Sequence, residues 1–194
     1  MSTLSRRQLL GTAVGSAGLL AFRPVAARAA AGPTEADLAQ YRLLLGTELL
    51  GIELYGRAAR SSLFPAHRRR DFEQALANER QHLDTISGLL SGAGQVVPTA
   101  DDFDIAFPQR AFSSRLRLAE LGIELETAFL GAYLGAAATL SDPSVAAVAA
   151  RLAASQSRHL ALHWTIADNR PVGPAYPVPL DVQQVSDVID RYLT

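Results

Sequence analysis

Apolar and polar residues recur at helical spacing along four long stretches of the chain, and almost no stretch alternates as a strand would. The predicted helices run from about Thr34 to Ser62, from Pro65 to about 91–94, from about Arg110 to Leu140, and from Pro143 to just before Pro171. A shorter amphipathic helix is predicted over 181–193, with Val182, Val185, Ile189 and Tyr192 facing inward. The pattern therefore predicts an all-α protein.

The lengths of the connections predict how the helices pair. The first and third connections are short, so each joins two neighbouring antiparallel helices. The middle connection, from Ala93 to Gln109, has about 17 residues and is long enough to cross a bundle from end to end at about 3.3 Å per residue. Two hairpins joined by one long crossover make a four-helix bundle. The proline-rich segment 171–179 is expected to lie extended on that bundle.

The two hairpins share a repeated pattern of polar residues. The run "ELLGIELYGRAA" from Glu48 matches "ETAFLGAYLGAA" from Glu126, at an offset of 78 residues. The run "ANERQHL" from Ala77 matches "ASQSRHL" from Ala154, at an offset of 77. Duplication of one helical hairpin explains both offsets. The matched pairs are Glu48 with Glu126, Tyr55 with Tyr133, Glu79 with Gln156, and His82 with His159.

These polar residues lie on the apolar stripes of their helices, where core residues are expected. Residues three apart share a helix face, so Glu79 and His82 can hold one ion together. Converging buried carboxylates repel one another and lose hydration, and a divalent metal removes both costs. The chain has no cysteine, and oxygen with imidazole ligands suits iron, manganese or zinc. The alternative is that each inward glutamate has a private hydrogen bond to a tyrosine or arginine.

Over residues 33–194 the chain resembles bacterial ferritin-like domain proteins, of the branch that includes desiccation-related proteins. The resemblance rests on the two Glu…Tyr runs, the Glu-x-x-His pair, the proline-containing crossover and the tail 174–193. It implies a ferritin-like four-helix bundle with a short C-terminal helix and a centre for two metals. The implied roles are Glu48 and Glu126 as terminal ligands, Glu79 as a bridge, His82 and His159 as nitrogen ligands, and Tyr55 and Tyr133 beside the ligands.

The chain departs from the family pattern at Gln156, where a second bridging glutamate is expected. Four carboxylates neutralise two divalent ions, whereas three leave one positive charge uncompensated in a low-dielectric core. Three outcomes stay open: a metal pair with a solvent hydroxide, a single metal, or a centre that binds none. His163, one turn beyond His159, is a further candidate ligand; the alternative is a polar residue at the margin of the core. Haem between His82 and His159 is not expected among so many glutamates.

The first thirty residues predict export. Arg6 and Arg7 precede an apolar run over 9–22, and "ARA" at 27–29 supplies a cleavage site. The run has 14 residues, against roughly 20 needed to cross a bilayer, so a signal peptide is predicted and no membrane span after cleavage. The paired arginines are typical of a twin-arginine signal; an ordinary Sec signal is the alternative. The expected division is a signal peptide over 1–31, the bundle over 32–170 and a tail over 171–194.

The net charge of the chain limits which classes of binding partner are expected. The whole chain has a net charge of −1, and cleavage after Ala29 removes four of 18 basic residues, leaving 14 against 19 acidic ones, a net charge of −5. Nucleic acid is therefore not an expected partner; metal ions and the twin-arginine export machinery are. The predicted function is an exported non-haem metal-binding protein that handles iron, manganese or peroxide during stress. The alternative is a metal-free bundle with a structural or partner-binding role in the cell envelope.

Overall fold

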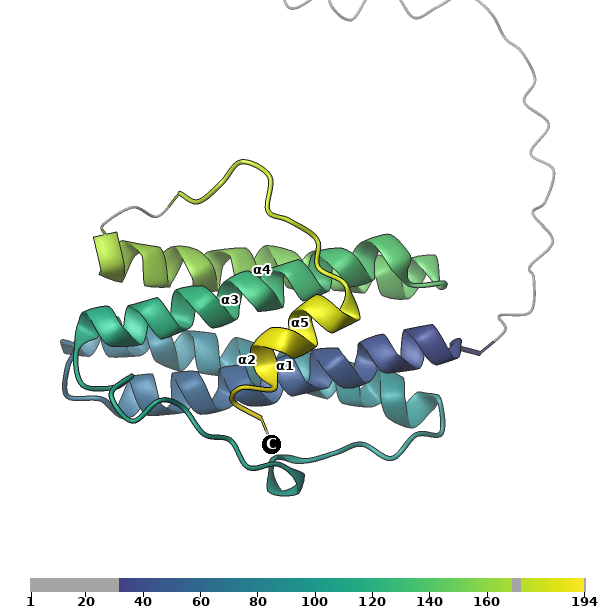
Figure 1. Cartoon of the computed structure of the whole chain (residues 1–194), viewed down its shortest axis with the longest axis horizontal. Helices are drawn as coiled ribbons and strands as arrows, with labels where there is room; N and C mark the ends of the chain where they lie inside the picture. Colours follow the sequence, from purple (N-terminus) through teal and green to yellow (C-terminus); the bar gives the residue numbers. More distant parts are fainter. Residues whose placement is uncertain (1–31, 169–171, 194) are drawn as a thin grey trace, which may run out of the picture. The chain divides into compact units, whose positions relative to one another are not determined.

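The structure, a computed structural model, describes residues 32–168 and 172–193. Its four long helices form a bundle (Figure 1), which confirms the predicted all-α fold. The helices are α1 (Glu35–Arg60), α2 (Ala66–Gly92), α3 (Arg115–Thr139), α4 (Pro143–Asp168) and the short α5 (Val182–Ile189), with a 3-10 turn over Ala100–Asp102. No helix of this described part is long and apolar enough to cross a membrane. The predicted signal peptide, with Arg6 and Arg7, lies outside the described residues.

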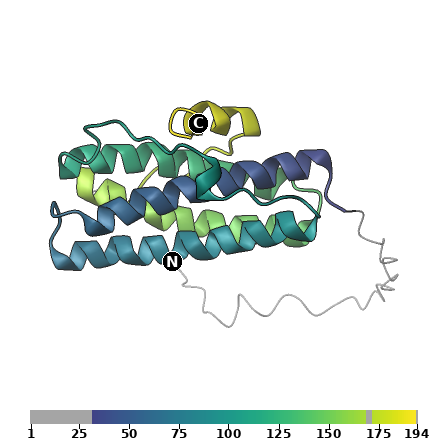
Figure 2. The same ribbon diagram turned by 90° about the horizontal axis from the view of Figure 1, so that it is seen from below.

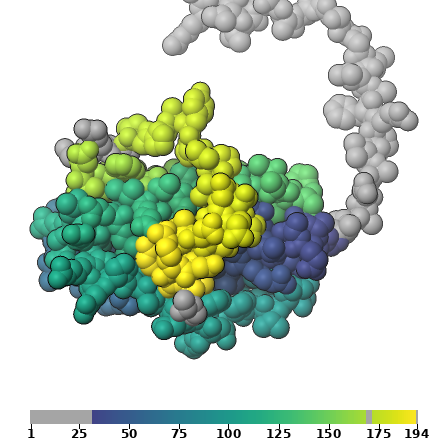
Figure 3. All heavy atoms as spheres, viewed as in Figure 1, coloured from purple at the N-terminus to yellow at the C-terminus, as the bar shows by residue number. Residues whose placement is uncertain are grey.

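The helices pair as two hairpins. α1 packs along α2 and α3 along α4, and the hairpins meet through α1 with α3 and through α2 with α4 (Figures 1 and 2). The crossover between α2 and α3 runs back along the bundle, as Figure 1 shows. It is held to the end of the chain where the Ala106 amide donates to the Tyr192 carbonyl at 2.9 Å. α5 lies across α1 and α3, where it covers one face of the bundle (Figure 3).

Two segments differ from the sequence-based expectation. The third helix begins at Arg115 and not near Arg110, because the Ser114 hydroxyl caps it by accepting from the Arg117 amide at 3.2 Å. Residues 172–179 are exposed and do not lie flat on the bundle. The tail returns to it at Leu180, whose amide donates to the Gly131 carbonyl at 2.9 Å. A proline-rich segment forms few regular hydrogen bonds of its own, so contacts at its ends, such as this one, fix its position on the bundle.

Each hairpin combines one deeply buried helix with one amphipathic helix. Most of α1 and α3 is buried, whereas α2 and α4 bury a single stripe. Along α2 that stripe is Phe72, Ala75, Glu79, His82, Ile86 and Leu90. Along α4 it includes Ala149, Ala153, Gln156, His159 and His163. The helical repeat therefore brings the polar residues of both motifs to the centre of the bundle, at positions that otherwise hold core side chains.

Candidate metal centre

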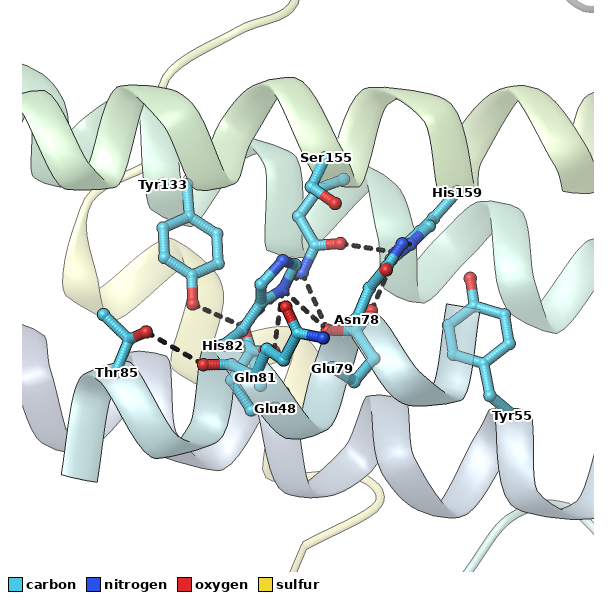
Figure 4. A network of polar contacts seen from close by, with 12 residues as sticks. Glu48, Tyr55, Asn78, Glu79, Gln81, His82, Thr85, Tyr133, Ser155 and His159 are labelled. Carbon is cyan, nitrogen blue, oxygen red and sulfur yellow. Dashed lines mark hydrogen bonds and ion pairs between the residues drawn. The ribbon is translucent and has the colours of Figure 1, made fainter. Parts of the chain in front are cut away.

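Two groups of three side chains meet in the middle of the bundle. One consists of Glu48, Glu79 and His82, and the other of Glu79, Glu126 and His159. In each group, one oxygen or nitrogen atom from every residue lies within 4.8 Å of the others, and all members are buried. The five ligands predicted from the sequence thus come together, with Glu79 shared by both groups. Figure 4 shows Glu79 between the two imidazoles.

Both imidazoles present Nδ1 to the same glutamate, from opposite sides. His82 Nδ1 lies 3.1 Å from Glu79 Oε2 and 3.3 Å from Glu48 Oε2. His159 Nδ1 lies 2.8 Å from Glu79 Oε1 and 3.8 Å from Glu126 Oε1. Each oxygen of Glu79 therefore faces one histidine and one group of donors. This is the arrangement that a carboxylate needs in order to be a common ligand of two ions.

The two tyrosines connect the hairpins across the centre. The Tyr133 hydroxyl of α3 donates to Glu48 Oε1 of α1, and the Tyr55 hydroxyl of α1 donates to Glu126 Oε1 of α3, the latter at 2.5 Å. The duplication seen in the sequence therefore becomes a near two-fold arrangement in space. Each tyrosine holds one oxygen of a glutamate and leaves the other oxygen free to face the centre.

Three buried carboxylate oxygens form no well-aligned hydrogen bond in the described part of the chain: Glu48 Oε2, Glu79 Oε1 and Glu126 Oε2. The first two have only an imidazole Nδ1 beside them, that of His82 at 3.3 Å and that of His159 at 2.8 Å. All three glutamates are inaccessible to solvent. A buried acceptor without a donor costs free energy, and three in one place call for a cation. One such oxygen comes from each glutamate, with an imidazole beside each group. The donor set therefore fits iron, manganese or zinc.

Gln156 is fully buried among these ligands and bonds to both groups. Its amide nitrogen donates to Glu48 Oε1 at 3.4 Å and to Glu79 Oε2 at 3.3 Å. Its amide oxygen lies 2.8 Å from His159 Nδ1, within hydrogen-bonding distance. The side chain occupies the place of the expected second bridge but brings no charge. It satisfies part of the cluster by hydrogen bonding.

Burial and mutual repulsion distribute the protons of the metal-free centre unevenly. Burial, with the nearby charge of Glu79, raises the pKa of Glu48 and of Glu126 well above the usual range. Burial alone would also raise the pKa of Glu79, but hydrogen bonds from Glu48, His159 and His82 lower it. Burial would lower the pKa of His82, yet Glu48 and Glu79 raise it to about 9. At neutral pH the centre thus holds an anionic Glu79 against a cationic His82.

We expect the metal-free domain to lose stability as pH rises from about 6.5 to about 9, because the lowered pKa of His163 opposes the loss only below pH 6.5. The raised pKa of His82, about 9 against 6.5, adds stability that is full below pH 6.5 and lost as pH rises through 9. The pKa values of Glu48 and Glu126 are raised in the folded protein above the value of 4.5 that they have in the unfolded chain. As pH rises above 4.5, the unfolded chain gives up these protons more readily than the folded protein does, so unfolding becomes more favourable. Urea unfolding with a chelator across this pH range measures the slope, and a flat profile would contradict the proton distribution.

Sequence reasoning missed Asn78, and it left His163 open between a ligand and a polar residue at the core margin. The Asn78 amide nitrogen lies 3.1 Å from His159 Nε2, where it orients the ring. Asn78 is next to Glu79 in the sequence and does not lie on the apolar stripe of its helix, so the helical pattern did not point to it. His163 does not join either ligand group: its Nε2 lies 3.1 Å from the Tyr55 hydroxyl. Because Tyr55 gives its proton to Glu126, Nε2–H of His163 donates to the tyrosine oxygen. Burial lowers the pKa of His163 to about 3, so this imidazole is neutral.

Gly122 makes room for His163. A Cβ at position 122 would fall far inside van der Waals contact with the imidazole ring. At the repeat offsets of 78 and 77, the first hairpin has Leu44 and Ile86 in the corresponding places, both buried. The second hairpin has thus exchanged an aliphatic pair for a glycine and a buried imidazole. A comparison of the two repeats is the signal that finds this pair in the sequence.

Gly122→Ala should destabilise the domain by about 1–3 kcal/mol, because the added methyl group must displace a fully packed ring. Gly88→Ala is the matched control: Gly88 lies in α2 with no atom within 4 Å of the new Cβ, so it should gain about 0.5–1 kcal/mol from helix propensity. Adding His163→Ala should recover most of the loss at position 122. Denaturant unfolding measures all three, and equal effects of the two glycine substitutions would contradict the packing account.

Comparison with known proteins agrees with the fold. Residues 34–167 match the ferritin-like domain family over most of the chain. No curated protein matches the chain. The matched residues contain all four long helices almost to their ends and every residue of the candidate metal centre. The chain belongs to the ferritin-like domain family.

Proposed function

We propose that this is an exported metal-binding protein that holds two divalent ions, iron or manganese, on either side of Glu79. The observation that carries the proposal is the shared glutamate. Each of its oxygens faces one imidazole, and each group of donors includes a carboxylate oxygen without a hydrogen bond. Glu48 and His82 would complete one position, and Glu126 and His159 the other.

The chain itself contributes positioning and exclusion of water. Tyr133 and Tyr55 orient the terminal glutamates, Asn78 orients His159, and His163 orients Tyr55. Glutamates inaccessible to solvent interact strongly with a cation because no water screens them. Bound iron or manganese would supply one-electron chemistry toward peroxide or dioxygen. This supports a role in metal or peroxide handling during stress, in line with the resemblance to desiccation-related proteins.

Metal analysis of the folded protein exported by its native host tests the proposal. Two equivalents of iron or manganese per chain are expected, and a chelated sample should take up two again on titration. Metal binding must displace protons from Glu48, Glu126 and His82, so uptake should weaken as pH falls. Failure of native and reconstituted protein to hold either metal would overturn the proposal.

The second candidate function is a metal-free bundle with a structural or partner-binding role. Gln156 is the observation that favours it, because its amide hydrogen-bonds to Glu48, Glu79 and His159 and so holds the cluster together without an ion. This candidate predicts a protein without metal whose melting temperature does not change when iron or manganese is added. Thermal melts with and without metal separate the two functions.

Export is tested by replacing Arg6 and Arg7 together with lysine. The double variant should stay in the cytoplasm, because the twin-arginine pathway recognises the arginine pair and not charge alone. Arg23→Lys with Arg28→Lys is the matched control, since it makes the same change elsewhere in the first thirty residues and should leave export intact. Cell fractionation measures both. Normal export of the Arg6/Arg7 variant would show that another pathway carries the protein.

A further inference from the structure

A pocket of about 400 Å³ opens between α2 and α4 and reaches His82. We call it the α2–α4 pocket. Its α2 side is polar, and its α4 side carries two aliphatic and two cationic side chains: Val148, Leu152, Arg151 and Arg158. Figure 4 shows this seam, with His82 of α2 facing α4. His82 is 6% exposed and the three glutamates are not exposed at all, so the pocket ends on the outermost residue of its ligand group.

Two arginines give the lining of this pocket a positive charge, and no carboxylate in the lining balances it. Arg151 and Arg158 are exposed, and the pocket has no carboxylate in its lining. Within the described residues neither arginine forms an ion pair, and Arg158 donates only to the Ser155 hydroxyl, at 3.3 Å. An arginine on a helix can pair with an acidic residue three or four positions away, and neither arginine has one at those positions. Among the described residues, two guanidinium groups without a carboxylate partner therefore lie beside the candidate centre.

Arg158 also borders a second pocket, of about 370 Å³, that reaches His159. Asn78, which orients that histidine, lines both pockets. Arg68 in the second pocket is already paired with Asp71 at 2.9 Å. Arg158, which has no ion-pair partner among the described residues, therefore lines both of the pockets that reach the two imidazoles.

The metal-loaded centre has an excess positive charge that an anion held by these arginines would balance. With two divalent ions bound, three carboxylates leave one positive charge uncompensated, because Gln156 is neutral. An anion bound in the α2–α4 pocket beside His82 would supply that charge next to the first ligand group. Guanidinium groups bind carboxylate and phosphate oxygens in pairs of hydrogen bonds. Val148 and Leu152 on the same wall add apolar surface that a phosphate cannot use.

We propose that the α2–α4 pocket binds a small organic carboxylate, an anionic partner whose negative charge beside His82 balances the metal-loaded centre from outside the ligand cluster. Arg158 and Arg151 receive the carboxylate, and Val148 and Leu152 pack against a short aliphatic tail. The role as partner rests on the proposed function, since the charge deficit arises only with metal bound. The arginines and the apolar wall make the pocket a carboxylate site in the metal-free protein as well.

Calorimetric titration with butyrate and with inorganic phosphate tests the class of ligand. Butyrate should bind the metal-loaded protein more tightly than phosphate does, and Arg158→Gln should weaken butyrate binding about tenfold, the loss of one charge-assisted hydrogen bond. Arg80→Gln is the matched control, because Arg80 is exposed on α2 and lines neither pocket. Tighter binding of phosphate, or equal butyrate affinity in Arg158→Gln and the parent, would overturn the proposal.

Metal titration in the presence of butyrate tests the coupling. Butyrate should tighten metal binding in the parent, and metal should tighten butyrate binding by the same factor. Gln156→Glu supplies the charge internally, so the coupling should shrink in that variant. A protein that binds metal without any effect of butyrate would overturn the partner role alone. Absence of metal binding would contradict the proposed function. The carboxylate site would then be tested by the metal-free protein alone, which should still bind butyrate in a way that depends on Arg158.

Discussion

Replacing Glu79 with Gln should abolish the binding of both metal ions. Glu79 is the one residue that belongs to both groups of donors, and each of its oxygens faces a different imidazole. Removing one member of a buried charged set costs about 3–5 kcal/mol, which corresponds to at least about a hundredfold loss of affinity. The substitution also makes the first motif identical in kind to the second, Gln-x-x-His. Metal titration followed by calorimetry measures the loss.

A double variant supplies the control for this result. Glu79→Gln with Gln156→Glu keeps the number of carboxylates and moves the shared ligand from α2 to α4. Because the hairpins are related by a duplication, the moved carboxylate would lie next to His159 and Glu48, as Gln156 does now. Metal binding should return in large part. Loss of binding in the single variant without recovery in the double would mean that the two halves of the centre are not equivalent.

Gln156→Glu alone should tighten the binding of two iron or manganese ions by at least about tenfold, since it restores a fourth carboxylate in a low-dielectric site. The two side chains are nearly isosteric, so packing should hardly change. Gln156 donates hydrogen bonds to Glu48 and Glu79, and an ionised carboxylate at this position would lose both and be repelled by the anionic Glu79. The metal-free variant should therefore be less stable than the parent at neutral pH, by about 1–3 kcal/mol. Metal binding should more than recover this loss.

Stoichiometric titration and thermal melts with and without chelator measure both effects. Gln156→Asn is the matched control, because it shortens the amide and adds no charge. It should lower metal-free stability without tightening metal binding. An unchanged metal affinity in Gln156→Glu, together with unchanged metal-free stability, would show that position 156 does not contribute electrostatically to the centre.

The sequence determined the helices, their pairing and the members of the centre. Helical periodicity depends on residues three and four apart, and loop lengths decide which helices are neighbours, so both can be read locally. The duplication added long-range information, because residues in register in two copies of a hairpin must converge when the copies pack together. That is why Glu48, Glu79, His82, Glu126 and His159 could be chosen together. The start of α3 was set too early because its cap depends on one serine among several polar residues.

Only the tertiary structure decided what each polar side chain faces. His163 sits one turn from His159, yet its partner is Tyr55, 108 residues away, in space that Gly122 vacates. Gln156 bonds to glutamates on two other helices, and Arg158 stands between two openings formed by α2 with α4. Such contacts depend on the rotation of each helix about its axis and on the volumes packed opposite. Periodicity places a residue on a face of its helix, but only packing decides which atom from another helix meets it.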